Sequence, residues 1–219
     1  MKAIPPCLLA CTALMAGGCG GSSSSSTRSH AQASTRRSAT AESAPPALAG
    51  VRGRVLTAGE MPGYSPQGQR LLGIDAQSWT IVDLTPPAQR ATQGAFLSRI
   101  GFVAGVRENL VAAAGQESGL STVEQFRSAA GARTELANVV KQFLASPPDA
   151  KTFAVPGIPR GRGFGRSGAG MAGVNVAFVS GRYCYLVGAG GPTGVPGAPT
   201  RAVVIAAAQR LYHRVPRVG

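Results

Sequence analysis

Glycine and arginine are interspersed through residues 157–173, a composition that suits the binding of an anion. Arg160, Arg162 and Arg166 supply guanidinium groups, and the glycines between them leave backbone N–H groups accessible. Guanidiniums and converging backbone amides together bind a phosphate or a carboxylate. We therefore expect an anion-binding site here, with Arg182 of the following segment as a further candidate.

The same segment contains the pattern G-x-G-x-x-G twice, at residues 163–168 and 168–173. A dinucleotide site needs a helix after the glycines and an acidic residue about twenty positions further on. Here a strand-like sequence follows, and Asp149 is the last acidic residue of the chain. The pattern therefore does not indicate a nucleotide, and no cofactor is expected.

Side chains that could act as a nucleophile or a base are few. Ser167 lies in the sequence Gly165–Ala169, which lacks the final glycine of the G-x-S-x-G nucleophile elbow. His213 closes a predicted helix, where a histidine commonly interacts with the helix dipole. Cys184 alternates within a predicted strand and has the character of a small core residue. We expect no catalytic residue and predict that the chain is not an enzyme.

The carboxylates of the predicted domain fall singly along the sequence. They lack the D-x-D or H-x-x-E groupings that serve metal binding or paired acid–base catalysis, so no metal site is expected. They are Glu60, Asp75, Asp83, Glu108, Glu117, Glu124, Glu135 and Asp149. Two of them could still meet in the folded chain beside a serine, so a hydrolase remains an alternative.

The beginning of the chain has the order of a secretory signal. Lys2 precedes an apolar run over residues 3–15, and the small residues 16–18 follow it. This order of charge, apolar core and small residues is typical of a signal peptide. The run is too short to cross a bilayer as a helix. Export of the chain is therefore predicted.

Ala16-Gly17-Gly18-Cys19 resembles the lipobox of bacterial lipoproteins. The resemblance implies cleavage behind Gly18 and a diacylglyceryl thioether on Cys19, which would anchor the chain at the outer side of the cell membrane. The family prefers leucine three positions before the cysteine, where this chain has alanine. Leu8-Leu9-Ala10-Cys11 also matches the pattern, although cleavage there would leave a shorter apolar core. An ordinary signal peptide or an uncleaved anchor is a further alternative.

The composition divides the chain into four parts. We expect a signal peptide over residues 1–18, a tether over 19–49, a single globular domain over 50–214 and a tail over 215–219. The tether is rich in Ser, Thr and Ala without periodic apolar residues, so it is predicted to be flexible, with a reach of about 30 Å. In the lipidated chain Cys184 would be the only free thiol, which excludes an intramolecular disulfide.

The charge is strongly positive and uneven. The formal net charge is +13, and nine basic residues but no acidic one follow Asp149. These basic residues are Lys151, Arg160, Arg162, Arg166, Arg182, Arg201, Arg210, Arg214 and Arg217. Such a segment attracts anions, and outside the membrane the candidate partners are anionic lipid headgroups or acidic wall polymers rather than nucleic acid. A bias toward GC-rich codons would also enrich arginine, and this alternative stays open.

The first half of the domain predicts short strands around one helix. The expected elements are a strand over 53–56, a turn at 61–64, a strand or a helix within 70–82, a helix from Thr85 to Arg99 or Ile100, and a strand over 102–106. Thr85 has the position of a helix cap before Pro86 and Pro87. Gly101 has the position of a left-handed stop.

The strongest helical pattern covers residues 122–144. Ser121 and Glu124 have the spacing of a capping box, and apolar residues recur every three to four positions up to Leu144. Pro147 and Pro148 end the pattern. Gly131 is expected to weaken this helix relative to alanine.

The last third predicts a strand over 152–155, a glycine-rich loop over 157–173, a hairpin of residues 174–179 and 182–187, and a helix over 199–213. Phe178, Tyr183 and Tyr185 share one face of the hairpin. These rings either pack in the core or form the wall of an apolar pocket beside the long helix.

Strand hairpins interleaved with long helices predict an α+β fold, in which an antiparallel sheet with a strong C-terminal hairpin packs against two to three helices. The layout is similar to that of PsbP-like domains of some bacterial lipoproteins, a likeness of fold that assigns no functional residue. The function expected from all these features is a lipid-anchored, non-catalytic extracytoplasmic domain that docks on an anionic surface or partner. A carrier or sensor of an apolar ligand is the alternative.

Overall fold

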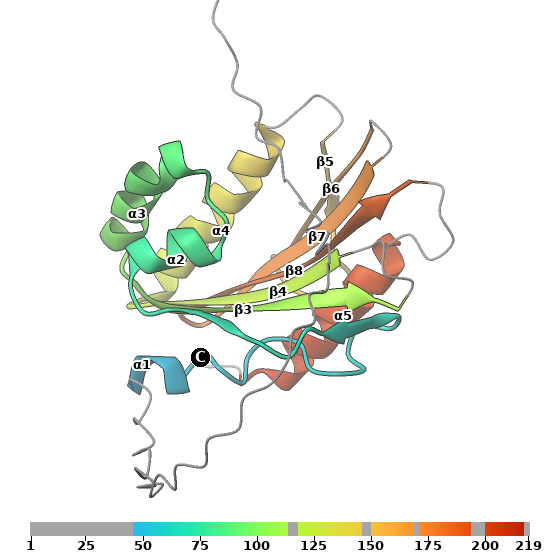
Figure 1. The fold of residues 1–219 in the computed structure, drawn as a ribbon, viewed down its shortest axis with the longest axis horizontal. Helices are drawn as coiled ribbons and strands as arrows, with labels where there is room; N and C mark the ends of the chain where they lie inside the picture. Colours follow the sequence, from blue (N-terminus) through green and yellow to red (C-terminus); the bar gives the residue numbers. More distant parts are fainter. Residues whose placement is uncertain (1–45, 114–117, 146–149, 169–170, 194–199, 217–219) are drawn as a thin grey trace, which may run out of the picture. The chain divides into compact units, whose positions relative to one another are not determined.

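The described residues belong to one compact unit, residues 44–219. The structure, a computed structural model, describes residues 46–113, 118–145, 150–168, 171–193 and 200–216 (Figure 1). The predicted signal peptide, Cys19 and most of the predicted tether lie outside the described residues. Among the described residues, no helix combines the length and the apolar character needed to cross a membrane.

The described strands form one eight-stranded sheet in which every pair is antiparallel, in the order β1-β3-β4-β8-β7-β6-β5, with β2 also paired to β3. The strands are β1 (Tyr64–Pro66), β2 (Leu71–Gly73), β3 (Phe102–Ala112), β4 (Ser118–Phe126), β5 (Lys151–Ala154), β6 (Arg162–Gly168), β7 (Met171–Ser180) and β8 (Tyr183–Pro192). The predicted α+β class with an antiparallel sheet is confirmed.

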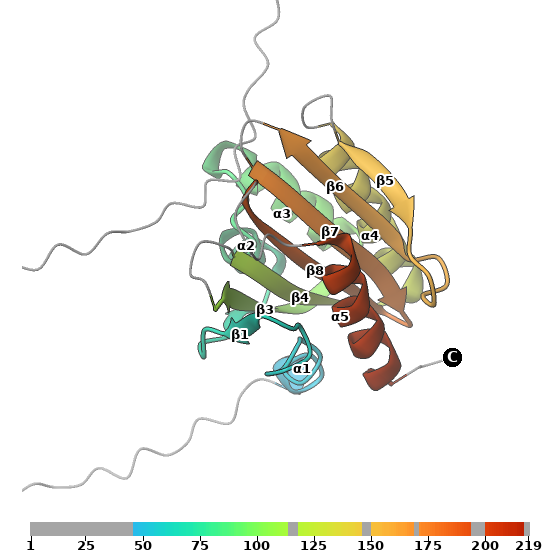
Figure 2. The ribbon, with the colours of Figure 1, turned by 90° about the vertical axis from the view of Figure 1, so that its right-hand side faces the viewer.

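Helices cover both faces of this sheet (Figures 1 and 2). The helices are α1 (Pro46–Ala49), α2 (Ala76–Val82), the 3-10 turn η1 (Pro87–Gln89), α3 (Arg90–Arg99), α4 (Ala129–Leu144) and α5 (Arg201–Arg214). Val204, Ala207 and Leu211 of α5 are fully buried in the core against one face. On the other face, a second core gathers Trp79 of α2 and Leu97 of α3 with neighbouring side chains.

The hairpin of β7 and β8 forms as predicted and lies inside the sheet. Phe178 pairs with Tyr185 and Val176 with Val187, and Gly181 takes a φ of +56° in the turn. The face that carries these four side chains belongs to the core under α5, whereas Cys184 on the opposite face belongs to the second core. Both faces are therefore covered, which agrees with their apolar composition.

The predicted helix over 122–144 is wrong in its first part. Residues 118–126 form β4, which is held between β3 and β8 by hydrogen bonds on both edges. Helix α4 begins only at Ala129, where the side chain of Ser128 accepts a hydrogen bond from the backbone N–H of Gly131 at 3.1 Å. Pairing on both edges of β4 outweighs a helical pattern that the sequence carries by coincidence.

The capping box predicted for Ser121 and Glu124 is therefore absent. Ser121 instead accepts a hydrogen bond from the backbone N–H of Leu56 at 3.0 Å, and Glu124 is buried on the face of β4 toward α2. Gly131 is no weakness either, because a Cβ there would overlap the carbonyl oxygen of Ile100. The glycine permits the close approach of α4 to the end of α3.

Several element boundaries also differ from the expectations. Residues 53–56 form turns and bends rather than a strand, and the ambiguous stretch 70–82 contains both β2 and α2. The helix after Pro86 begins without a side-chain cap, so Thr85 does not cap it, while Gly101 ends α3 with the expected left-handed φ of +84°.

The C-terminal elements agree better, with one exception. The strand predicted over 152–155 is β5, and the last helix begins at Arg201 behind its cap Thr200. Residues 162–168, predicted as part of a glycine loop, form β6 between β5 and β7.

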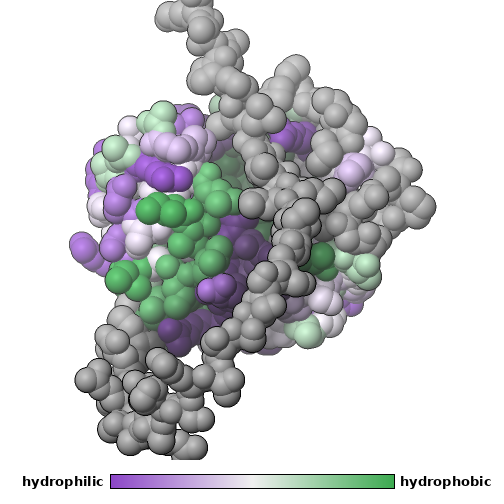
Figure 3. All heavy atoms as spheres, viewed as in Figure 1, coloured by the Kyte–Doolittle hydropathy of each residue, from purple (hydrophilic) through white to green (hydrophobic). Residues whose placement is uncertain are grey.

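Helix α2 and the residues just after it expose apolar side chains. Ile81 is 55% exposed and Leu84 is 65% exposed. Figure 3 shows hydrophobic atoms gathered over this part of the molecule, beside a hydrophilic surface.

Candidate anion-binding site

A hollow of about 290 Å³ lies at the edge of the sheet formed by β5, β6 and β7, next to the start of α5. Its lining combines three basic residues with one aromatic ring and small residues. The lining residues are Lys151, Phe153, Gly165, Arg166, Ala172, Gly173, Val174 and Arg201. Figure 2 shows these strands side by side, with α5 crossing the sheet beside them.

The glycines of β6 shape this hollow. Phe153 of β5 lies against Gly163, where a Cβ would overlap the phenyl ring. Gly165 also lies close to β7, because a Cβ there would lie 2.8 Å from the carbonyl oxygen of Gly173. Because these glycines have no side chains, neighbouring groups approach β6 closely and the space of the hollow is not filled from this strand.

The ring of Phe153 also positions Arg201. Its guanidinium carbon lies 4.3 Å from the ring centre of Phe153, a cation–π contact. Arg201 is also the first residue of α5, whose cap Thr200 accepts a hydrogen bond from the N–H of Val203 at 3.3 Å. The positive end of the helix dipole adds to the charge of the guanidinium.

The electrostatics of the hollow favour an anion. Lys151, Arg166 and Arg201 each carry a positive charge, and no carboxylate is among the described residues that line the hollow. Basic side chains that converge without acidic partners concentrate anions near them. The arrangement can bind a phosphate, a sulfate or a carboxylate, and its described lining residues include no Ser, Cys, His, Asp or Glu.

The four arginines singled out from the sequence lie in different places. Arg166 lines the hollow, whereas Arg162, on the same strand, is exposed and is not among the lining residues. Arg160 lies in the exposed loop before β6, with a φ of +59°. Arg182 lies in the β7–β8 turn, its guanidinium carbon 5.7 Å from the ring centre of Tyr183.

Lys151 and Arg201 were not expected as site residues. They lie fifty positions apart in the sequence and meet Arg166 only through the pairing of β5 with β6 and the position of α5. Their presence in the acid-free segment was the only sequence signal that could have pointed to them.

The tyrosine-rich face of the hairpin lies in the core. Phe178 stacks on Tyr185 with ring centroids 4.7 Å apart, and Tyr212 of α5 meets Phe178 edge-on at 5.5 Å. Arg54 packs over Tyr183 and donates a hydrogen bond to the hydroxyl oxygen of Tyr185 at 3.0 Å. These contacts support the interpretation as core packing, and the rings of Phe178, Tyr183 and Tyr185 are not among the residues that line the hollow at the sheet edge.

Neither His213 nor Cys184 is among the residues that line the hollow at the sheet edge. His213 lies in the last turn of α5, and Cys184 is buried in β8, where burial raises the pKa of its thiol well above the usual value. Ser167 lies in β6, and its side chain lies outside the description. Among the described residues, no three His, Cys, Asp or Glu side chains are arranged to hold a metal ion.

Three carboxylates that are isolated in the sequence do come near one another. Burial, followed by the negative charge of Asp83, raises the pKa of Glu135 to about 8. Burial also raises the pKa of Asp83 to about 6 and, with the charges of Glu135 and Asp83, raises that of Glu124 well above its usual range. The possibility that carboxylates distant in sequence meet in the folded chain, which the sequence left open, is therefore realised by this group. Glu117 and Asp149 lie outside the described residues.

No protein-family model and no curated protein matches the sequence. Among solved structures, the fold is similar to the extracellular domain of PknH from Mycobacterium tuberculosis, with a TM-score of 0.50. The sequence identity is 14%, and the match covers 74% of this chain and 93% of that one. At this identity the similarity concerns the fold.

Proposed function

We propose that this chain is a lipid-anchored extracytoplasmic lipoprotein whose domain is non-catalytic and docks on anionic lipid headgroups through the basic hollow. The observation that carries the proposal is the convergence of Lys151, Arg166 and Arg201 on one hollow in an acid-free part of the chain. The signal-like beginning, Cys19 and the similarity in fold to an extracellular domain support the location.

Lipid headgroups are favoured over wall polymers because of the predicted anchor. An acyl chain on Cys19 and a tether with a reach of about 30 Å would keep the domain close to the membrane surface at a high effective concentration. Each basic side chain near an anionic membrane contributes about 1 kcal/mol. Three such residues give a weak but useful attraction that orients the hollow toward the lipid.

Vesicle binding by the full chain carrying Cys19→Ser tests the docking step. We expect binding to vesicles rich in phosphatidylglycerol at about 0.05 M salt, a strong loss at about 0.5 M salt, and little binding to phosphatidylcholine. The triple variant Lys151→Gln, Arg166→Gln and Arg201→Gln should bind at least about tenfold more weakly.

A matched triple variant, Arg99→Gln, Arg127→Gln and Arg133→Gln, removes the same charge from exposed positions at α3 and α4. It should retain most of the binding. An equal loss for both triples would show that net charge acts alone and would overturn the assignment of the hollow. Vesicle binding that is independent of salt concentration and lipid charge would overturn the docking proposal as a whole.

The anchor is tested separately in cells. Cys19→Ser should abolish acylation and move the chain out of the membrane fraction, whereas the matched change Cys11→Ser should leave both unchanged. Fractionation together with labelling by a fatty-acid analogue measures this. If Cys11→Ser abolished acylation and Cys19→Ser did not, Cys11 would be the modified cysteine.

A further inference from the structure

A second hollow, of about 460 Å³, lies beside β1, β2 and β3. Its lining residues are Arg52, Pro66, Gly68, Arg70, Leu72 and Glu108. It shares no lining residue with the basic hollow. Its volume lies within the range of about 300–1,000 Å³ that is common for small-molecule sites.

The carboxylate of Glu108 is the unusual feature of this hollow. Glu108 extends from β3 and is only 2% exposed. Its Oε2 accepts a hydrogen bond from Nε of Arg70 at 3.0 Å, whereas its Oε1 is buried and has no hydrogen-bond partner among the described residues. Buried carboxylate oxygens are rarely left without a donor, so this atom indicates a place for a donor supplied from outside.

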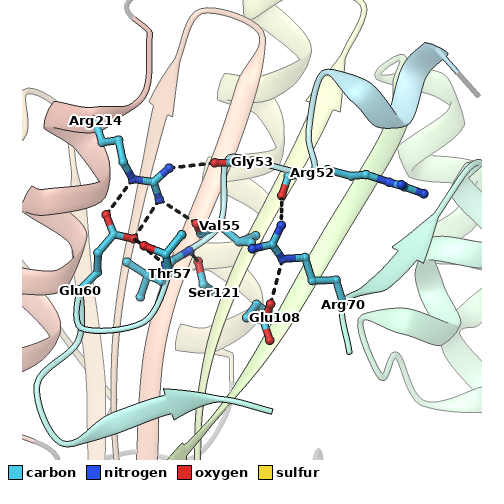
Figure 4. A network of polar contacts seen from close by, with 10 residues as sticks. Arg52, Gly53, Val55, Thr57, Glu60, Arg70, Glu108, Ser121 and Arg214 are labelled. Atoms are coloured by element: carbon cyan, nitrogen blue, oxygen red, sulfur yellow. Dashed lines mark hydrogen bonds and ion pairs between the residues drawn. The ribbon is translucent and has the colours of Figure 1, made fainter. Parts of the chain in front are cut away.

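Arg70 is held in place by the chain itself. Figure 4 shows its guanidinium between the carboxylate of Glu108 and the backbone carbonyl of Arg52, to which Nη1 donates a hydrogen bond at 2.7 Å. The guanidinium of Arg70 is thereby fixed at the hollow, and its side chain remains 38% exposed. Arg52, which is exposed, lines the same hollow.

The charges of the hollow specify the class of ligand. Two guanidiniums and one carboxylate give the lining a formal charge of one positive unit, which favours an acid. The ion pair with Arg70 already partly neutralises Glu108, so an additional cation gains less there than it would beside an isolated carboxylate. A neutral hydroxyl is not repelled by the guanidinium of Arg70, and it can donate a hydrogen bond to Oε1 of Glu108.

We propose that this hollow binds a small hydroxylated acid of monosaccharide size, such as a uronic acid. A ring hydroxyl donates a hydrogen bond to Oε1 of Glu108, while the acid group of the same ligand meets the guanidinium of Arg70. The exposed side chain of Arg52, which extends away from Arg70 in Figure 4, adds a positive charge at the edge of the hollow. Pro66 and Leu72 offer apolar surface to the carbon skeleton. The site is independent of the docking surface, so either proposal can fail without the other.

A titration of the full chain carrying Cys19→Ser, followed by amide chemical shifts, tests the proposal. The probes are galacturonate, galactose, which lacks the acid group, and propionate, which lacks the hydroxyls. Galacturonate should shift the amides of Gly68, Leu72 and their neighbours, and it should bind at least about fivefold more tightly than either other probe.

Two variants assign the roles. Arg52→Gln removes one guanidinium at an exposed position and should weaken galacturonate about tenfold without changing the binding of galactose. Arg99→Gln makes the same change on α3 and should alter the binding of neither galacturonate nor galactose. Glu108→Gln should reduce the preference for galacturonate over propionate, and a preserved amide spectrum would show that the fold is retained.

Three results would overturn the proposal. In the first, galacturonate leaves residues 66–72 unperturbed. In the second, it shifts only residues around Lys151 and Arg201, so that it occupies the basic hollow instead. In the third, propionate binds as tightly as galacturonate, which would leave no role for a hydroxyl at Glu108.

Discussion

The indole Nε1 of Trp79 donates a hydrogen bond to Oε1 of Glu124 at 2.5 Å, and this bond joins α2 to the centre of the sheet. The indole lies over two glycines, because a Cβ at Gly73 would lie 2.8 Å and one at Gly105 2.5 Å from its ring. Glu124 is thereby held in the second core beside Glu135 and Asp83. Glu124 and Glu135 are buried and Asp83 is half-buried, and holding three acids close together has consequences for stability that can be measured.

The group of buried carboxylates predicts an unusual dependence on pH. The pKa of Glu135 is raised to about 8 from the usual 4.5, so the folded chain binds more protons than the unfolded chain between these pH values. The contribution of Glu135 to the free energy of unfolding therefore falls as the pH rises through this range. Glu135→Gln should remove this decrease, since glutamine stays neutral.

Urea unfolding at about pH 4 and about pH 8 measures the effect. The variant and the parent should be nearly equal at the lower pH, and the variant should be more stable by roughly 2–4 kcal/mol at the higher pH. A constant difference at both values would contradict the assignment of the raised pKa.

Glu60 should show the opposite trend. Burial by itself would raise the pKa of Glu60, but hydrogen bonds from Arg214 and Thr57 and the charge of Arg214 outweigh it, so the pKa lies below 4.5. The contribution of Glu60 is present above 4.5 and is lost as the pH falls through the folded-state pKa. Glu60→Gln should therefore destabilise the chain near neutral pH. The difference from the parent should shrink as the pH falls below 4.5, as followed by the same unfolding experiment.

Arg214 should resist replacement by lysine. Its Nε and Nη2 donate to the two carboxylate oxygens of Glu60 at 2.7 Å and 2.9 Å, and it also donates to the carbonyl oxygens of Gly53 and Val55 at 2.8 Å and 2.7 Å (Figure 4). Lysine cannot reproduce this planar fork. Arg214→Lys should lower the free energy of unfolding by about 1–2 kcal/mol and speed hydrogen exchange near residues 53–60.

Arg133→Lys, at an exposed position of α4, is the matched control and should be neutral in both measurements. Equal behaviour of the two variants would mean that the contacts of Arg214 contribute nothing to the stability of the domain.

The start of α4 can be tested with two serines. Ser128→Ala removes the cap that accepts from the N–H of Gly131 and should cost about 1 kcal/mol. Ser121 caps no helix but accepts from the N–H of Leu56 inside the protein, so Ser121→Ala should leave helix α4 intact and destabilise the segment around Leu56. Amide exchange rates, measured residue by residue, separate the two effects.

Gly131→Ala should destabilise the chain although alanine is the better helix former. The added Cβ would overlap the backbone carbonyl of Ile100, which cannot move without shifting the end of α3. We expect a loss of about 1–3 kcal/mol, measured by thermal or urea unfolding.

Gly94→Ala is the control for this prediction. Gly94 lies in α3, and its added Cβ would lie 2.6 Å from Oε1 at the end of the Gln77 side chain, with Cδ and Cα of Gln77 at ordinary contact distances of 3.7 Å and 3.8 Å. That side chain can turn away, so this variant should be neutral or more stable by up to about 1 kcal/mol. A stabilising Gly131→Ala would contradict the close packing of α4 on α3.

Local signals in the sequence were sufficient for several elements. The hairpin around Gly181 follows from alternating side chains and a short turn, and the stop of α3 at Gly101 follows from a residue that tolerates a positive φ. The mixed class of the fold follows from the succession of such elements. These features depend on residues close together in the chain, and a single sequence displays them.

The tertiary structure alone decided the rest. Residues 118–126 became a strand because β3 and β8 offered partners on both edges, and 162–168 became a strand because β5 and β7 did the same. The basic hollow, the carboxylates near Trp79 and the hollow beside Glu108 all join residues that are distant in sequence. Propensity and spacing act over a few residues, whereas strand pairing and burial are decided by neighbours that only the folded chain brings together.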